Sequence, residues 1–344
     1  MGIRNLHKFL GKHAPHVYVP TSLDRYQFRT IAVDVNLYLY RFKASHRNRW
    51  LTAFLNMVTL LRKHRIRAIF VYDTKAPAEK YDKQQERKSR KSNVEKQAYD
   101  LRMALSEYQQ TGECDQILVH ASQKRKLKRL LSPQTLAQQI DVSAIEQEIQ
   151  HLETQVVSVT RADVRTTKDL LDLLSVEYYD SPNEAETLCA HMCVQGKVDA
   201  VLSNDTDVLV YGTPVFLSNL HMGNENCTEI RFTEVLQALD ITHKQFIDFC
   251  IMCGTDYNKN IYNVGPEKAF KMIREVHDID HLDERYDASI LNHVRVREIF
   301  GLSPDLPDIG EHAKRSEIDW NRFDEFAFRY NLFVDKSALR DVFQ

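Results

Sequence analysis

The sequence predicts an α/β fold whose central sheet is mainly parallel and flanked by helices. Apolar, strand-like runs occur at 29–34, 67–73, 176–179 and 200–203, and helical patterns alternate with them. Alternation of this kind is typical of parallel sheets, because parallel neighbours need a long crossover between them. Glycine supplies only 10 of 344 residues, which disfavours a fold of short strands joined by glycine-rich turns.

Hydrophobic spacing predicts the elements in order. The run at 29–40 begins as a buried strand and gains helical character, and 51–64 carries apolar residues at helical spacing. Further helices are predicted at 166–174 and 184–195, and two more within 242–276. The stretch 79–160 is strongly polar and interrupts the alternation, so it is predicted to be an insertion or helical cap, with a Gln/Glu-rich helix at 134–156.

Length and charge set limits on the class of protein. A chain of 344 residues allows one large domain or two to three small ones. The net charge of −2 hides a division: residues 1–180 carry 30 Lys and Arg against 20 Asp and Glu, and residues 181–344 carry 16 against 28. This asymmetry indicates either a polyanion-binding site or an acidic centre beside a basic surface, although chance clustering of solvated charge would also produce it.

Compartment signals are plain. No secretory signal peptide and no run of 18 apolar residues is present, so the sequence predicts an intracellular protein, nuclear or cytoplasmic, that is neither secreted nor membrane-bound. The six cysteines lack framework spacing and are expected to be reduced thiols. Cys250 and Cys253 form a CxxC pair within an apolar run, which indicates a buried helix face in place of a zinc or redox site.

Six acids follow predicted strands or open a predicted helix. Each alone is better explained as a turn former, a helix cap or a dipole-favoured acid. Together they suggest a site, because clustered carboxylates repel one another unless hard cations neutralise them, and all-oxygen ligation suits Mg²⁺ or Mn²⁺. Two such ions can activate water and stabilise a leaving oxygen in phosphodiester cleavage. The six are Asp34, Asp73, Glu184, Glu186, Asp205 and Asp207.

Basic residues crowd the polar insertion just beyond Asp73. Lys80, Lys83 and Arg87 would share a face if this segment is helical, and five of the six residues in 124–129 are basic. One such run is most often a solvated face. Two runs beside an acid cluster favour contact with phosphate.

The two helices predicted within 242–276 enclose a glycine turn. Gly265 and Pro266 open the second helix, whose free N–H groups could bind an anion such as a DNA phosphate, and Lys268 lies in its first turn. Helix pairs joined by a glycine are common, so this signal is weak by itself. Beside an acid cluster it suggests a sequence-independent grip on duplex DNA.

The order of these features resembles the flap endonucleases, the XPG-type structure-specific 5′ nucleases. The resemblance runs over about residues 1–275 and rests on Met1-Gly-Ile, Ala32-Val-Asp34, Val71-Tyr-Asp73, Ser181-Pro-Asn-Glu-Ala-Glu186, Asn204-Asp-Thr-Asp207 and Gly254-Thr-Asp256. It implies a PIN-like nuclease core with an N-terminal region (1–105), a helical arch or cap (79–165), an internal region (166–235), a helix–two-turn–helix (241–276) and a C-terminal helical extension (277–344).

The resemblance also implies roles for single residues. Asp256 joins the six acids as a seventh metal-linked carboxylate, and Lys80 and Arg87 match the catalytic basic residues of the family's gateway. Gly2, Tyr40, Lys83, Gly265 and Lys268 are implied to contact DNA. Backbone carbonyls of Asn260, Ile261 and Val264 are implied to bind K⁺ at the hairpin.

Three departures from the family pattern are visible. The segment between Asp73 and Glu184 is longer than expected, and Asn263 replaces the first glycine of the hairpin, where asparagine tolerates the left-handed conformation. The tail shows no recognisable sliding-clamp peptide, so clamp binding is not predicted.

The resemblance implies a monomeric, Mg²⁺-dependent enzyme that cuts branched or 5′-flapped duplex DNA near single-strand/double-strand junctions, as a flap endonuclease or 5′→3′ exonuclease in replication or repair. Mn²⁺ is implied as a substitute ion. Alternatives are a junction resolvase, an RNA-directed 5′ nuclease or a non-catalytic junction-binding protein.

Overall fold

A computed structural model describes residues 2–75, 77–126, 140–310 and 317–343, with the side chains of 123–126 left out. The chain forms two compact units. The first comprises Met1–Phe42, His46–Tyr81 and Val159–Gln344, and the second comprises Lys43–Ser45 and Asp82–Ser158. Part of the basic run at 124–129 and of the helix expected at 134–156 lies outside the described residues.

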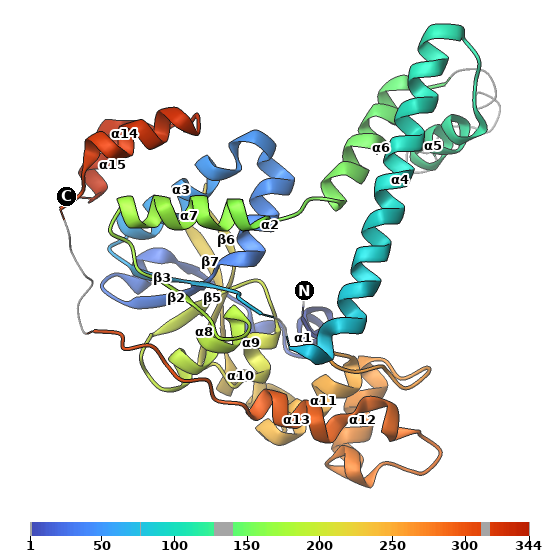
Figure 1. Ribbon diagram of the computed structural model, residues 1–344. Coiled ribbons are helices and arrows are strands. Elements are labelled where there is room, and N and C mark those ends of the chain that lie inside the picture. Colours follow the sequence, from blue (N-terminus) through green and yellow to red (C-terminus); the bar gives the residue numbers. More distant parts are fainter. Residues whose placement is uncertain (1, 76, 127–139, 311–316, 344) are drawn as a thin grey trace. The chain divides into compact units, whose positions relative to one another are not determined.

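A seven-stranded sheet forms the centre of the first unit, in the order β1-β7-β6-β5-β2-β3-β4 (Figure 1). The five strands from β6 to β4 are parallel to their neighbours, whereas β7 and β1 continue the sheet antiparallel. The prediction of a mainly parallel α/β sheet is therefore confirmed, and the antiparallel edge was not predicted. The strands are β1 (Val19–Ser22), β2 (Thr30–Asp34), β3 (Arg67–Tyr72), β4 (Tyr178–Asp180), β5 (Ala200–Leu202), β6 (Val215–His221) and β7 (Asn226–Arg231).

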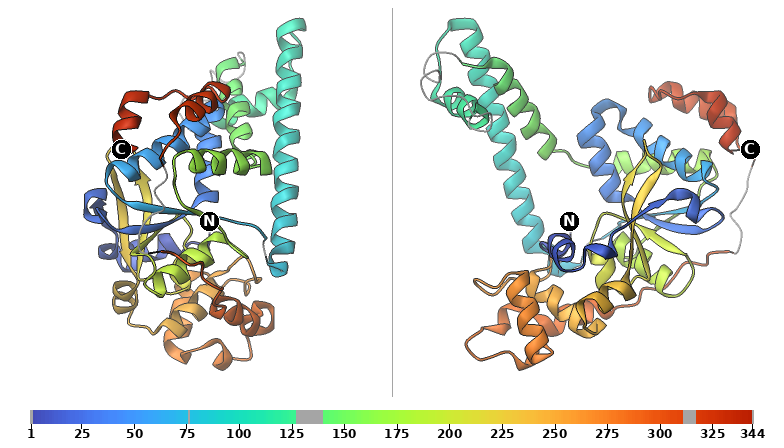
Figure 2. Two further views of the ribbon diagram at one scale, coloured as in Figure 1. Left: turned by 60° about the vertical axis from the view of Figure 1, so that its left-hand side comes forward. Right: turned by 180° about the vertical axis from the view of Figure 1, so that it is seen from behind.

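Alternate residues of the strands belong to two separate apolar cores, one on each face of the sheet. In β2, Ile31 and Val33 pack into the core that contains α2, α3, α7, α14 and α15, while Ala32 packs with α1 and α8 to α13. Helices on both faces are visible when the unit is seen from two sides (Figures 1 and 2). Side chains of a strand alternate between faces, so strands buried on both sides are apolar throughout.

The helices of the first unit cover these two faces. Their bounds are α1 (Leu6–His13), α2 (Val35–His46, of which Lys43–Ser45 belong to the second unit), α3 (Trp50–Lys63), α7 (Arg161–Leu173), α8 (Ala185–Val194), α9 (Asp207–Val210), α10 (Phe232–Leu239), α11 (His243–Cys253), α12 (Pro266–Val276), α13 (His293–Gly301), α14 (Trp320–Arg329) and α15 (Lys336–Phe343). Short 3-10 turns are η1 (Pro15–Val17), η2 (Leu23–Tyr26), η3 (Arg47–Arg49), η4 (Ala78–Lys80), η7 (Ile279–His281) and η8 (Ala288–Leu291).

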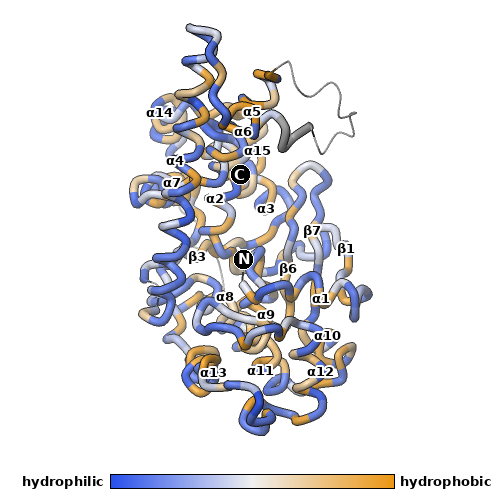
Figure 3. Tube along the Cα trace, turned by 90° about the vertical axis from the view of Figure 1, so that its right-hand side faces the viewer, coloured by the Kyte–Doolittle hydropathy of each residue, from blue (hydrophilic) through white to orange (hydrophobic). Residues whose placement is uncertain are grey.

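The second unit is built from helices α4 (Tyr81–Thr111), α5 (Gln116–Lys126) and α6 (Val142–Gln155). α4 is strongly hydrophilic along its N-terminal half (Figure 3), and its buried residues, Ala98, Leu101, Ala104 and Leu105, lie nearer its C-terminal end. These residues form a small core of their own with Leu118 and Ile145. In the described part of the chain, no helix is long and apolar enough to cross a membrane.

Strand order determines where a site can form. The chain passes outward from β2 through β3 to β4, then returns to β5 on the opposite side of β2. Sheets of this kind bind ligands beyond the carboxyl ends of the strands, where the strand order reverses. The carboxyl ends of β5, β2 and β3 are therefore the expected position of a functional site.

Candidate active site

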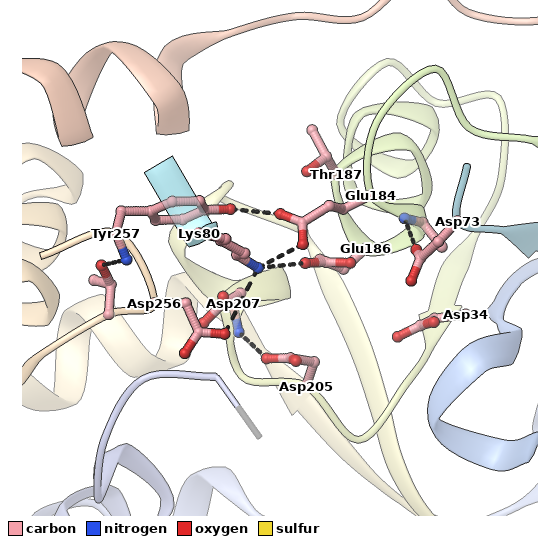
Figure 4. Close-up of polar contacts among 12 residues, drawn as sticks. Asp34, Asp73, Lys80, Glu184, Glu186, Thr187, Asp205, Asp207, Asp256 and Tyr257 are labelled. Carbon is pink, nitrogen blue, oxygen red and sulfur yellow. Dashed lines mark hydrogen bonds and ion pairs between the residues drawn. The ribbon is translucent and has the colours of Figure 1, made fainter. Parts of the chain in front are cut away.

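The predicted acids lie at this reversal point or in segments that reach it. Asp34 is the last residue of β2, and Asp73 directly follows β3. Asp205 lies in the turn between β5 and α9, and Asp207 is the first residue of α9. Glu184 and Glu186 open α8, and Asp256 follows α11. All seven belong to the first unit. Figure 4 shows them approaching one another from separate segments of the chain.

The turn after β5 is ordered by local hydrogen bonds. The Ser203 hydroxyl donates to Asp34 Oδ2 at 2.7 Å and accepts from the backbone N–H of Asp205 at 3.0 Å. The N–H of Asp207 then donates to Asp205 Oδ1 at 3.0 Å. Ser203 thus joins β2 to the turn after β5, and sequence reasoning missed it, although serine before two acids is a usual turn signal.

The N-terminal end of α8 binds Asp73, the acid that follows β3. The N–H of Ala185 donates to Asp73 Oδ1 at 2.6 Å, which satisfies one of the free N–H groups at this helix end. Glu184 is the N-cap residue and Glu186 lies in the first turn. Acids are favoured there because the N-terminal end of a helix carries partial positive charge.

Lys80 lies among the carboxylates and is almost fully buried, with 7% of its surface exposed. Its ammonium group donates to Glu184 Oε1 at 2.6 Å and lies 3.7 Å from Glu186 and 3.8 Å from Asp256 (Figure 4). The expectation that Lys80 shares a helix face with Arg87 is wrong, because Lys80 belongs to η4 and α4 begins at Tyr81. Pro77 precedes η4 and provides its N-cap.

Burial and mutual repulsion raise the pKa of five of these acids. Burial, with the charge of Asp73 next, raises the pKa of Asp34 to about 7. Burial also raises the pKa of Asp73 and Asp205, and it raises the pKa of Glu186 and Asp207 well above the usual value. For Lys80, burial lowers the pKa, but the charges of Glu186, Asp207 and Glu184 more than offset this and raise it above the ordinary lysine value.

Gly2 reaches the same site from the start of the chain. A Cβ atom at this position would lie 2.0 Å from Asp205 Oδ1 and 2.8 Å from Asp207 Oδ1, and the backbone has φ +89°. Only glycine fits such close contact together with this left-handed conformation. The residue type at position 2 is therefore set by the acids of the β5–α9 turn.

The loop after α11 is tied to the helix end by two asparagines. Asn258 donates to the carbonyl of Ile251, and Asn260 donates to those of Met252 and Cys253, so three C-terminal carbonyls of α11 are paired. Asn263 has φ 56°, the left-handed conformation expected there. Gly265 is the N-cap of α12, and the carbonyl of Ile261 accepts from the N–H of Val264.

The remaining predicted contacts are spread over both units. Lys268 lies on α12, with its ammonium 4.8 Å from the centre of the Tyr286 ring, and Tyr40 is exposed on α2. Lys83 and Arg87 lie on α4 in the second unit, where Lys83 pairs with Glu86. Cys250 and Cys253 are buried on α11 as free thiols, as the apolar run indicated.

The oxygen donors of this site suit a hard divalent cation. No three His, Cys, Asp or Glu side chains of the described residues already form a metal site, and the ammonium of Lys80 lies among the acids. The donors fit nonetheless, because carboxylate oxygens are the ligands that Mg²⁺ prefers. In addition, the buried Asp207 Oδ1 has no hydrogen-bond partner among the described residues. A buried carboxylate oxygen without a partner is costly, and a cation would remove that cost.

Comparison with known proteins gives a consistent result. Family models match the XPG N-terminal domain at residues 1–94 and the XPG I-region at 175–256. A probable RAD2-like endonuclease (076L) of Invertebrate iridescent virus 3 is 33% identical over 363 aligned positions, covering 97% of this chain and 93% of the relative. Flap endonuclease 1 of Salmo salar is 27% identical, covering 99% of this chain and 84% of the relative.

A solved structure gives the same fold. The catalytic core of Rad2 in complex with DNA substrate has a TM-score of 0.64 at 15% identity, with 99% of each chain covered. At this identity the likeness concerns the fold alone, and the sequence matches identify the family. The two matched regions and the 33% identical relative, aligned along almost the whole chain, show that this protein belongs to the XPG family of RAD2-like endonucleases.

Proposed function

We propose that this protein is a Mg²⁺-dependent, structure-specific 5′ flap endonuclease with 5′→3′ exonuclease activity on branched DNA. The observation that supports this most strongly is the gathering of seven carboxylates around the carboxyl ends of β5, β2 and β3. Burial and mutual repulsion raise the pKa of five of them. Similarity to flap endonuclease 1 supports the substrate class.

The acids would hold the metal. Asp34, Asp73, Glu184, Glu186, Asp205 and Asp207, completed by Asp256, supply the oxygen ligands, and Mn²⁺ would substitute for Mg²⁺. Two bound ions would activate a water molecule and stabilise the leaving oxygen. Lys80 would keep its bond to Glu184 and donate a second N–H to the phosphate being cut, because an ammonium group carries three donors.

Other residues would hold the DNA. The free N–H groups after Gly265, with Lys268 in the same helix turn, would bind a phosphate of the duplex. Lys83 and Arg87 on α4 would bind the phosphates of the 5′ strand, and Tyr40 would stack on a base. Carbonyl oxygens of Asn260, Ile261 and Val264 would bind K⁺; the Ile261 carbonyl, already bonded once, keeps a second lone pair for this purpose.

Replacing Asp207 tests the metal site. Asp207→Asn keeps the shape of the side chain but removes the charge, and cleavage of a 5′-flap duplex in Mg²⁺ is expected to fall by at least 100-fold with binding of the flap retained. The melting temperature without Mg²⁺ should not fall, because the pKa of this carboxyl is raised in the folded state, so its ionised form opposes folding near neutral pH. Asp305→Asn, at an exposed loop position, is the control. Unchanged cleavage by Asp207→Asn would refute the metal assignment.

A substrate panel tests the activity itself. The wild-type protein with Mg²⁺ should cut 5′ flaps faster than blunt duplexes, bubbles, four-way junctions and RNA flaps. A preference for four-way junctions would identify a resolvase, and a preference for RNA flaps would identify an RNA-directed enzyme. Tight binding to junctions with no cleavage in Mg²⁺ or Mn²⁺ would identify a non-catalytic binding protein.

A further inference from the structure

We propose that Tyr257 is a positioning residue, which fixes Lys80 within the active site by holding Glu184. This inference rests on the proposed endonuclease function, because it concerns the residue that would serve the phosphate. Tyr257 directly follows Asp256, at the start of the loop that leads from α11 to α12. It thereby connects the proposed duplex-binding element to the catalytic centre.

Tyr257 and Lys80 divide one carboxylate between them. The Tyr257 hydroxyl donates to Glu184 Oε2 at 2.7 Å, while the ammonium of Lys80 donates to Oε1 at 2.6 Å (Figure 4). The same ammonium lies 4.8 Å from the centre of the Tyr257 ring, which is within cation–π range. Each oxygen of Glu184 therefore accepts one hydrogen bond, and the two residues that donate these bonds also contact each other.

The ring of Tyr257 is itself fixed. The residue is 6% exposed, and its ring meets Phe300 of α13 edge-to-face at 5.6 Å. Its backbone N–H donates to Thr255 Oγ1 at 2.9 Å. A buried tyrosine whose ring is packed and whose backbone is hydrogen-bonded has little freedom to turn, so its hydroxyl points in a defined direction.

Lys80 has few other contacts of comparable quality. Its distances to Glu186 and Asp256, 3.7 and 3.8 Å, are too long for hydrogen bonds and carry charge attraction without direction. Within the described ranges, the bond to Glu184 is the hydrogen bond that gives the ammonium its direction. If Glu184 were free to rotate, the position of Lys80 would spread, and catalytic groups lose rate when their placement varies by about 1 Å.

The variant Tyr257→Phe removes the hydroxyl and keeps the ring. With saturating 5′-flap DNA and Mg²⁺, the single-turnover rate is expected to fall about tenfold, while the dissociation constant for the flap, measured with Ca²⁺ in place of Mg²⁺, stays within twofold. Tyr211→Phe is the matched control. Tyr211 is also buried and also meets Phe300, at 5.4 Å, but its hydroxyl accepts from Thr187 Oγ1. The single-turnover rate of Tyr211→Phe should remain within twofold of the wild-type rate.

A double-mutant cycle shows whether Tyr257 acts through Lys80. In a Lys80→Ala background, Tyr257→Phe should change the rate by less than twofold, because the group that it positions is already absent. A full tenfold loss in that background would overturn the inference. So would an unchanged rate for Tyr257→Phe alone, or a loss confined to DNA affinity.

A readout without catalysis separates this inference from the proposed function. The rate at which an amine-acylating reagent modifies Lys80, followed by peptide mass spectrometry, should rise several-fold in Tyr257→Phe, with Lys268 as the internal reference. An unchanged rate at Lys80 would overturn the inference even if the wild-type protein cuts DNA. Conversely, a protein that cuts no branched DNA would refute the proposed function while leaving the Lys80 measurement decisive for the positioning role.

Discussion

At the residue scale, the acids were accessible from sequence because their surroundings are chemically unfavourable for them. Asp34 stands in an apolar strand, where a carboxylate is costly unless it meets a cation, and this cost is visible without coordinates. The position of Lys80 was not accessible, since it depends on a 3-10 turn whose direction no spacing rule predicts. Tyr257 was missed for a related reason, because an isolated tyrosine in a loop carries no periodic signal.

The residue-scale prediction concerns the Cβ atom that Gly2 lacks. Gly2→Ala would place a methyl group 2.0 Å from Asp205 Oδ1 in a backbone conformation with φ +89°, so the start of the chain or the β5–α9 turn must shift. The single-turnover cleavage rate is expected to fall by at least tenfold, with the melting temperature nearly unchanged because the chain end can move away.

Gly11→Ala is the matched control for this substitution. Gly11 lies inside α1, and a Cβ there meets nothing within 4 Å. Alanine is favoured over glycine in a helix by up to about 1 kcal/mol, so this variant should be slightly more stable and fully active. Equal activity in both variants would show that the close contact at Gly2 is unimportant.

At the scale of elements, the sequence pattern located the parallel strands β2, β3, β4 and β5 and most of their crossover helices, but it missed the parallel strand β6. It also missed the edge strand β1, which pairs with β7 alone and contains Pro20. Neither strand propensity nor alternation of apolar residues marks such a short edge strand clearly. The polar stretch predicted an insertion or helical cap at 79–160, which the family resemblance placed at 79–165, but neither resolved α4. That helix is polar around most of its circumference, so it lacks the apolar stripe by which a helix is normally recognised.

The element-scale prediction concerns the buried attachment of α13 to α11. Arg297 of α13 donates from Nε and a terminal nitrogen to the two oxygens of Asp248 on α11, both at 2.6 Å, and Asp248 also accepts from the N–H of Ile279 in η7. The Asp248 side chain is 4% exposed, whereas that of Arg297 is 30% exposed. Asp248→Asn should therefore lower the free energy of unfolding by about 2 kcal/mol, below the range for fully buried pairs because solvent reaches the arginine.

Asp280→Asn removes the other carboxylate that Arg297 contacts. Asp280 accepts from Arg297 at 2.7 Å but is 48% exposed, so its loss should cost less than about 1 kcal/mol. Urea unfolding of both variants and the wild-type protein gives the comparison. Equal losses for the two variants would mean that burial of Asp248 does not determine the strength of this contact.

At the scale of the whole molecule, the division of charge along the sequence does not coincide with the grouping of the acids in the structure. Asp34 and Asp73 come from the basic half, yet they join acids from the other half at one edge of the sheet, because parallel topology brings distant segments together. The sequence therefore predicted that the acids cluster, but it did not predict how the apolar side chains group into separate cores. The described residues form three apolar cores, and the one in α4 to α6 has no member from the sheet.

The separation of the apolar cores predicts that α4 to α6 can unfold locally without disturbing the sheet. Leu118 is fully buried in the small core of the second unit, and Leu170 of α7 is fully buried in a core of the first. Each substitution to alanine should cost about 2–5 kcal/mol in the core that it affects. Amide hydrogen exchange followed by mass spectrometry is expected to show faster exchange confined to α4, α5 and α6 for Leu118→Ala, with β2, β3 and β5 still protected. Leu170→Ala should give the opposite pattern. If Leu118→Ala raised exchange in the strands as much as in the helices, the two units would unfold as one, and independent opening of α4 to α6 would be refuted.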